Sequence, residues 1–363
     1  MLNPDRWTCD PAIKFGAGSC VKAVAFSANG KYLWSGGNDE VQVWRVEDGR
    51  QAATLGVIAP VLCLSVSKDG KWAAAGTSCG VLVWEAETYR PVSGFDSELS
   101  ERDESGWGVN GVDFSPNLPR FVSASNDKTA TIWDLQPRKR AWSFLQNGMV
   151  FAAKYSPKGD QIATAAGDSI RVYDSSTHRF LAKFDVIAIP YHNTGLLFPN
   201  NHLFSVCHDK IKQFEPSTKS LVSEWLVPDA NQHSSIAMSK HGEFIIHSTK
   251  HTVSFWDVAT HAQLDLIQQP GDINSIAISP DDSLIAVAGE DGKISINRLF
   301  CINVSFMSRS IMAFMNTLAL RSFFSPSNLM YFYTLHSRNQ TFGLTTLRLI
   351  LGSMTNSCTH MNY

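Results

Sequence analysis

The stretch VDFSPNLPRFVSASNDKTATIWD, residues 112–134, decides how this chain folds. With the three residues before it, it contains three short runs, Val109–Ser115, Arg120–Ser125 and Thr129–Trp133, separated by turn-forming Pro, Asn and Asp residues. Apolar side chains recur at every second position in each run, which is typical of antiparallel strands joined by tight turns. The stretch VAFSANGKYLWSGGNDEVQVWR, residues 24–45, repeats the same order of strands and turns.

The pattern recurs seven times with a period close to forty residues. The residue that closes each third run, aromatic in all but the last unit, falls at Trp44, Trp84, Trp133, Tyr173, Phe214, Trp256 and Asn297. A unit of this length made of short strands cannot bury its own faces, so it must stack on its neighbours. The period therefore predicts a repeat architecture.

A fourth apolar run follows the closing residue in six of the units. These runs are Gln51–Val57, Pro91–Phe95, Ala141–Leu145, Phe180–Val186, Leu221–Val227 and Gln263–Gln268. The seventh unit has no clear fourth run, but Pro11–Phe15, ahead of the first unit, resembles Pro91–Phe95. We therefore expect an all-β propeller of seven four-stranded antiparallel blades, in which the N-terminal strand completes the last blade and removes a free sheet edge.

Between residues 11 and 299 these units resemble WD40 repeats. The dipeptides that carry the resemblance are Trp133-Asp134 and Trp256-Asp257, with the variants Trp84-Glu85, Tyr173-Asp174 and Phe214-Glu215, and turn aspartates at Asp39, Asp127, Asp168, Asp209 and Asp291. The resemblance implies a buried network of Asp, His, Ser or Thr, and Trp in each blade. No unit here has the Gly-His pair of the family, and Asn297-Arg298 replaces Trp-Asp, so we expect weaker networks in single blades.

Composition and charge narrow the class of protein. The formal net charge is -2, the pI is near 6.6 and no basic stripe is present, which disfavours nucleic acid as a partner. The seven cysteines show no paired spacing, which favours a reducing compartment, and the first ten residues have no signal-peptide core. These features predict a location in the cytoplasm, the nucleus or both.

The last 64 residues, 300–363, differ from the rest in containing four charged side chains, all Arg. We expect two parts, a propeller over 1–299 and an apolar, disordered or accessory tail over 300–363. A translated retained intron or shifted frame is our preferred origin, because the tail shows no periodicity. The alternatives are a packed accessory layer and a membrane anchor over Ile311–Leu335, where Arg321 near the middle would cost roughly 2.5–3.5 kcal/mol.

Motifs for catalysis are absent from the sequence, which has no GxSxG, HExxH, GxxxxGK[ST] or CxxC. His192, His202 and His208 are close in sequence but fall on different elements, so we expect surface histidines there and not metal ligands. No catalytic, metal, cofactor or small-molecule site is predicted. We expect a noncatalytic scaffold or adaptor, with a membrane-tethered propeller and a propeller enzyme as the alternatives.

The expected partners are proteins or short peptides within a multiprotein complex. In the resembled family, the rim formed by turns between second and third strands often grips short peptides, which suggests Asn38, Ser78, Asn126, Asp168, His208, Lys250 and Glu290. The family's strand order places the insertion Ser97–Gly108 on the same face, with Glu98, Glu101, Asp103, Glu104 and Trp107 available to a basic or aromatic-bearing peptide. The alternative is that these residues are only turn formers and a solvated loop.

Two further groups of residues are expected to be structural. Arg138-Lys139-Arg140 forms a short basic run on the opposite face, which we interpret as a solvated turn with a weak contact signal. The tryptophans Trp34, Trp72, Trp142 and Trp225 are expected to pack between blades.

Overall fold

The computed structural model describes residues 11–17, 20–93, 95, 108–167, 169–186, 195–207, 209–227 and 235–299. Within these ranges the chain forms 27 strands and no helix. The acidic insertion up to Trp107, Asp168, His208 and the tail over 300–363 lie outside the described residues. No helix long and apolar enough to cross a bilayer occurs in the part of the chain that is described.

The strands form seven antiparallel sheets, which are the blades. The first blade holds β2 (Ala23–Phe26), β3 (Tyr32–Gly36), β4 (Glu40–Arg45) and β5 (Gln51–Gly56). The second holds β6 (Val61–Val66), β7 (Trp72–Thr77) and β8 (Gly80–Glu85). The third holds β9 (Val109–Phe114), β10 (Arg120–Ser125), β11 (Thr129–Asp134) and β12 (Lys139–Leu145). The fourth holds β13 (Val150–Tyr155), β14 (Gln161–Ala166), β15 (Ser169–Asp174) and β16 (Phe180–Asp185).

The remaining blades follow the same order. The fifth holds β17 (Leu196–Leu197), β18 (Leu203–Cys207), β19 (Lys210–Glu215) and β20 (Ser220–Leu226). The sixth holds β21 (Ile236–Met238), β22 (Phe244–Ser248), β23 (Thr252–Asp257) and β24 (Gln263–Gln268). The seventh holds β25 (Ile273–Ile278), β26 (Leu284–Gly289), β27 (Lys293–Arg298) and β1 (Pro11–Gly16).

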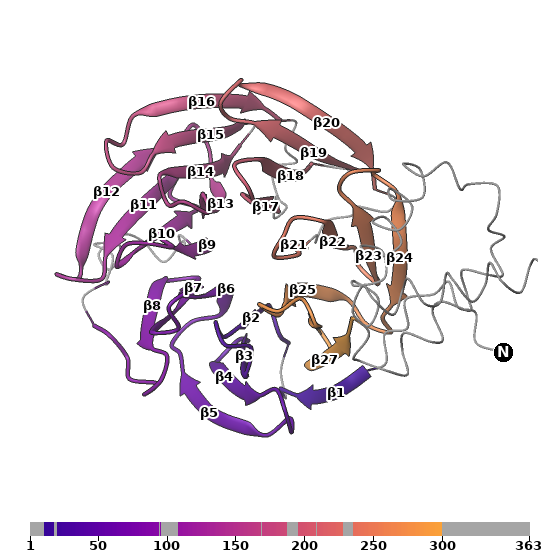
Figure 1. The fold of residues 1–363 in the computed structure, drawn as a ribbon. Helices are drawn as coiled ribbons and strands as arrows, with labels where there is room; N and C mark the ends of the chain where they lie inside the picture. The colour runs from indigo at the N-terminus through magenta and orange to yellow at the C-terminus, as the bar shows by residue number, and fades with distance from the viewer. Residues whose placement is uncertain are drawn as a thin grey trace, which may run out of the picture. The chain divides into compact units, whose positions relative to one another are not determined.

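The blades surround a common centre, with the first strand of each sheet innermost and the fourth outermost (Figure 1). Because the strands of a blade are antiparallel, the turns between first and second strands lie on one face of the ring. We call this the first-turn face, and it also carries the turns between third and fourth strands. The second-turn face carries the turns between second and third strands.

The ring closes where the sequence predicts. β1 pairs antiparallel with β27, so that Ile13 is opposite Ile296, Lys14 is opposite Ser295 and Phe15 is opposite Ile294. The seventh blade therefore takes three strands from one end of the repeat region and one from the other. This pairing covers the edge of β27 that would otherwise be free to pair with another chain.

The second blade differs from the prediction of four strands. Its expected fourth run, Pro91–Phe95, contributes only an isolated bridge between Trp84 and Pro91 and a hydrogen bond from Val92 N to Val83 O of 2.8 Å. Pro91 has no N–H to give to a ladder. Phe95 is 2% exposed and packs against Phe121 of the third blade, with ring centroids 5.4 Å apart. Burial of Phe95 in the next blade interface thus draws the chain away from the edge of β8.

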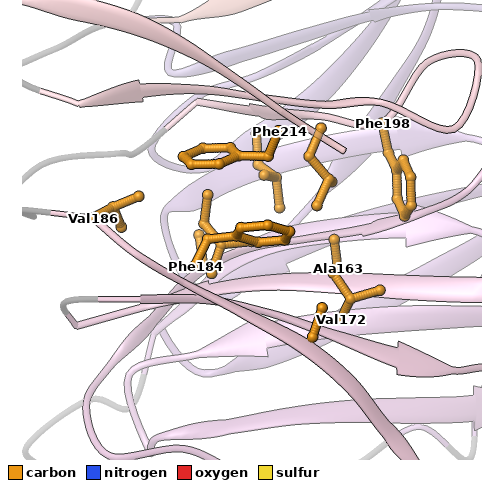
Figure 2. Close-up of a cluster of buried hydrophobic side chains, with 11 residues drawn as sticks. Ala163, Val172, Phe184, Val186, Phe198 and Phe214 are labelled. Atoms are coloured by element: carbon orange, nitrogen blue, oxygen red, sulfur yellow. The ribbon is translucent and has the colours of Figure 1, made fainter. Parts of the chain in front are cut away.

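Apolar side chains fill the spaces between neighbouring blades. Figure 2 shows the cluster between the fourth and fifth blades, in which Phe184 of β16 lies beside Phe214 of β19 with ring centroids 4.8 Å apart. Ala163 and Val172 contribute smaller side chains from the middle strands. Burial of this kind at each interface is the main stabilising contribution that a single blade cannot supply alone.

The buried hydrogen bond from the closing tryptophan to a serine on the second strand is present in some blades and absent in others. Trp44 Nε1 donates to Ser35 Oγ at 2.8 Å, and Trp133 Nε1 donates to Ser123 Oγ at 2.9 Å. In the sixth blade His247 stands at the serine position, and neither its ring nitrogens nor Trp256 Nε1 has a hydrogen-bond partner among the described residues. The blades therefore differ in the buried hydrogen bond of their closing tryptophan.

Candidate protein-interaction site

The described rim residues of the second-turn face lie in the turns where the sequence predicts them. Asn38, Ser78, Asn126, Lys250 and Glu290 each fall between the second and third strands of a blade. Three of them, Ser78, Asn126 and Glu290, donate a backbone hydrogen bond to the residue that precedes the first strand of the same blade. For example, Ser78 N donates to Pro60 O at 3.0 Å and Glu290 N donates to Asp272 O at 3.0 Å.

Several of the side chains on this face link neighbouring blades. Lys250 Nζ lies 3.2 Å from Asp272 Oδ2, which joins the sixth blade to the seventh. Asn126 Oδ1 accepts from Asn110 Nδ2 at 2.6 Å, and the same Nδ2 donates to Val150 O at 3.0 Å, across to the fourth blade. These contacts give Lys250 and Asn126 a structural role.

A pocket of about 530 Å³ opens on the first-turn face. Every blade contributes to its lining, which places it on the axis of the ring. The apolar part comes from the ends of the first strands and the residues that follow them, and it comprises Phe26, Ala28, Val66, Phe114, Pro116, Tyr155, Pro157, Phe198 and Pro280. The charged lining residues are Lys68, Asp113 and Lys240. This pocket lies at the mouth opposite to the one for which sequence analysis predicts a binding rim.

A repeated serine holds the turns around this pocket. Its hydroxyl oxygen accepts from the backbone N–H that begins the second strand, as in Ser67 with Trp72 N at 2.9 Å and Ser156 with Gln161 N at 3.0 Å. The equivalent bonds of the first, sixth and seventh blades come from Ser27, Ser239 and Ser279. Such side-chain to backbone bonds fix a turn without help from the rest of the fold.

Neighbouring turns also bond to one another around the pocket. Asn117 Nδ2 donates to Lys158 O at 2.5 Å, and Asn200 Nδ2 donates to His241 O at 3.3 Å. The backbone N–H of Lys240 donates to the Asp282 carboxylate, at 2.9 and 3.0 Å to its two oxygens. The rim of the pocket is therefore held in place by bonds between the blades as well as within them.

Comparison with known proteins agrees with this architecture. The model of the WD domain, G-beta repeat, matches residues 52–85, 99–134 and 264–296. The outer two stretches run from the fourth strand of one blade to the third strand of the next, and the middle one ends with β11. These stretches are WD40 repeats, and the chain folds as a seven-bladed WD40-type propeller.

The relatives of this WD40 propeller match it either with low identity or over a short stretch. It is 31% identical over 77 residues to the WD repeat-containing protein 89 homolog of Dictyostelium discoideum, covering 21% of each chain. It is 23% identical over 203 residues to the transcription initiation factor TFIID subunit 5 of Caenorhabditis elegans, covering 53% of this chain and 31% of the relative.

A third relative is the serine-threonine kinase receptor-associated protein of Gallus gallus, which is 22% identical over 192 residues, 51% of this chain and 53% of the relative. The chain thus spans between about a fifth and about half of the length of these three relatives.

The charges at the pocket of the WD40 propeller are unevenly balanced. Asp113 on the wall is paired with Lys154 Nζ at 3.0 Å, and its other oxygen accepts from Tyr155 N at 2.9 Å. Lys68 and Lys240 are exposed at the rim and form no ion pair with the residues that the structure describes. Burial raises the pKa of Tyr155, so its phenol stays neutral at physiological pH. Among the residues that line the pocket, the two lysines therefore outnumber the one aspartate, and the Asp282 carboxylate lies beside Lys240 at the rim.

The described ranges contain no recognisable metal site or catalytic centre. No group of three His, Cys, Asp or Glu side chains there is placed to hold a metal ion. His202 lies 3.1 Å from Glu215 Oε2, while His192 and His208 lie outside the described residues. Burial raises the pKa of the Cys63 thiol to about 12, which makes it a poor nucleophile.

The serine turns lead to a testable stability effect. Ser156 is 1% exposed, and its hydroxyl donates to Asp160 Oδ1 at 2.7 Å while it accepts from Gln161 N. We expect Ser156→Ala to lower the free energy of unfolding by about 1–3 kcal/mol, because the partly buried N–H of Gln161 and the Asp160 carboxylate each lose a hydrogen-bond partner. Urea denaturation measures this. The exposed Ser217→Ala is the control, and equal stabilities of the two variants would contradict the role assigned to the turn.

Proposed function

We propose that this WD40 propeller is a noncatalytic scaffold that binds segments of other proteins, or short peptides, within a multiprotein complex. The observation that carries the proposal is the closed ring with a pocket on its axis, whose rim turns are fixed by hydrogen bonds within and between blades. A rigid receptor loses little conformational entropy when a partner binds, so more of the contact energy appears as affinity.

The names of the relatives support a role in assemblies. One is a subunit of a transcription initiation factor and another is a receptor-associated protein. For this chain we propose protein partners, no nucleic acid, and a location in the nucleus, the cytoplasm or both. The binding unit is the propeller over 1–299, and the tail over 300–363 is a separate part.

Two surfaces are candidates for partner binding. The first is the axial pocket with Lys68 and Lys240 at its rim. The second is the second-turn face, where we propose that Asn38, Asn126, Asp168, His208, Lys250 and Glu290 act together with Glu101, Asp103, Glu104 and Trp107 of the insertion. The charges differ in sign: the pocket suits an acidic group, and the insertion suits a basic one.

Proximity labelling with the tagged full chain in cells tests the scaffold role. We expect a reproducible set of proteins, part of which is lost either with Lys68→Glu plus Lys240→Glu or with a Gly-Ser link in place of Ser97–Gly108. Lys219→Glu, an exposed charge change next to the outermost strand of the fifth blade and outside both the pocket lining and the insertion, is the control. The proposal fails if no protein is enriched over the tag alone.

A further inference from the structure

An aromatic cluster lies at the outer seam between the third and fourth blades. Trp142 of β12 stacks on His178, with ring centroids 4.7 Å apart and planes at 10°. Phe144 stacks on Tyr173 at 4.2 Å, and Tyr173 in turn contacts Phe180 of β16 at 6.0 Å. The five rings form one continuous cluster across the two blades.

Two of these rings are more exposed than packing requires. Trp142 is 47% exposed and Phe180 is 57% exposed. A similar stack joins the fifth and sixth blades, where Trp225 lies 4.4 Å from His261 and is only 8% exposed. A Trp–His stack between blades can therefore be made with a buried tryptophan, so the exposure of Trp142 is a separate property.

The other blades act as internal controls for the two positions. The strand register aligns Trp142 with Ala53, Ala182, Ser223 and Asp265. It aligns Phe180 with Gln51, Leu221 and Gln263. Most of these equivalent positions are occupied by small or polar residues, so the blade fold does not require a large exposed aromatic side chain there. Sequence analysis predicts a packing role for Trp142, and its exposure shows that this accounts for only part of the side chain.

Basic residues surround the exposed rings. Arg138, Lys139 and Arg140 precede Trp142 and are exposed, and Arg179 is exposed immediately before Phe180. Arg138, Lys139 and Arg179 form no ion pair with the residues that the structure describes.

The carboxylates of the two adjoining turns are engaged elsewhere. Asp174 accepts hydrogen bonds from the backbone and hydroxyl groups of Ser176 and Thr177, between 2.7 and 3.0 Å. Asp134 is paired with Arg120. Arg138, Lys139 and Arg179 are therefore left to interact with solvent or with a partner.

Both strands at this seam are the outermost strands of their blades (Figure 1). Lysine and arginine on an edge strand commonly prevent pairing with other chains. That role explains the charges but not the exposed tryptophan and phenylalanine, which would increase the risk of association. Exposed aromatic rings flanked by cations are the composition of a binding surface.

We propose that this basic aromatic seam, defined by Arg138, Lys139, Trp142, Arg179 and Phe180, is a docking surface for an acidic peptide segment of a partner protein. The segment carries an aromatic or aliphatic side chain that covers Trp142 and Phe180, while its carboxylates meet the cations. This inference rests on the proposed scaffold function and adds to it a third surface with a stated partner chemistry.

Fluorescence anisotropy tests the seam directly. The probe is a short fluorescein-labelled peptide of Glu and Asp with a central Phe-Leu pair, and the protein is the full chain. We expect binding that weakens with salt and falls by about tenfold or more with Arg138→Glu plus Arg179→Glu. Phe180→Gln, which introduces the residue found in two other blades, should weaken binding several-fold without unfolding the protein.

Matched variants in the fifth blade provide the controls. Lys219→Glu and Leu221→Gln change the equivalent turn and strand positions, and Leu221 is 49% exposed. They should leave the affinity for the probe unchanged. A probe with Lys in place of its acidic residues should not bind. Equal binding of both probes, no binding of the acidic probe, or an equal loss in the fifth-blade controls would overturn the seam proposal.

Proximity labelling separates this inference from the scaffold role. With Arg179→Glu plus Phe180→Gln, we expect some partners of the full chain to be lost. If every partner is retained, the seam proposal is wrong and the scaffold function stands. If the unchanged chain enriches no partner, the scaffold function itself fails.

Discussion

A chain that begins at Ala17 should be much less stable than one that begins at Pro11. The shorter chain lacks β1, and with it the hydrogen bonds to β27 and the fourth strand of the seventh blade. Backbone hydrogen bonds contribute about 1 kcal/mol each, so the loss of this six-residue strand should lower the free energy of unfolding by roughly 4 kcal/mol or more. Urea denaturation measures the difference.

The exposed edge of β27 should have a second effect. A free edge in a sheet pairs readily with other chains, so the shorter protein should associate as its concentration rises. The chain that begins at Pro11 is the matched control, because it lacks only residues 1–10 and retains β1. Equal unfolding midpoints for the two chains would show that β1 does not close the ring.

Acid should destabilise the propeller through His247. This side chain is fully buried, and burial lowers its pKa from 6.5 to about 4. Because the folded protein resists protonation while the unfolded chain accepts it, stability is complete above about pH 6.5 and falls as the pH drops toward 4. The difference between the two pKa values corresponds to roughly 3 kcal/mol of unfolding free energy. This contribution is lost between about pH 6.5 and about pH 4, and the stability changes little at lower pH.

The comparison variant for this effect is His247→Ser. Serine occupies the equivalent position in Ser35 and Ser123, where it accepts from the blade tryptophan. The variant should therefore offer Trp256 Nε1 a partner and lose most of the difference between unfolding free energies measured near pH 7 and about pH 4.5. His178, whose pKa is also lowered by burial, accounts for part of any remaining slope. A variant with the same pH dependence as the original protein would contradict this assignment.

Blade number and ring closure are predictable here because they depend on local rules. Alternating apolar runs and turn residues specify each strand, and the missing fourth run after Asn297 has one counterpart, Pro11–Phe15. The fourth strand of the second blade was not predictable by the same rules. The alternation in Pro91–Phe95 resembles that of the other outer strands. Whether the segment pairs with β8 depends instead on the burial of Phe95 against the third blade.

The axial pocket was missed for a related reason. The repeated serine at the end of the first strand, often followed by Pro as in Ser115-Pro116 and Ser156-Pro157, is visible in the sequence, but the repeat pattern does not show that these turns surround a pocket. Which mouth of a ring is hollow depends on side chains contributed by all seven blades, and no single repeat contains that information. The exposure of Trp142 likewise depends on what the neighbouring blade leaves uncovered.

The central claim is that the two ends of the repeat region meet in one sheet, and thiol cross-linking tests it most directly. Lys14→Cys and Ser295→Cys place thiols at directly paired positions. A short bifunctional thiol reagent should join them in the folded full chain and raise the unfolding midpoint, and mass spectrometry identifies the linked peptides. Lys14→Cys with Lys183→Cys, in β16 of the fourth blade, should not be joined. Absence of the link between positions 14 and 295, or equal linking in the control pair, would contradict the closed ring.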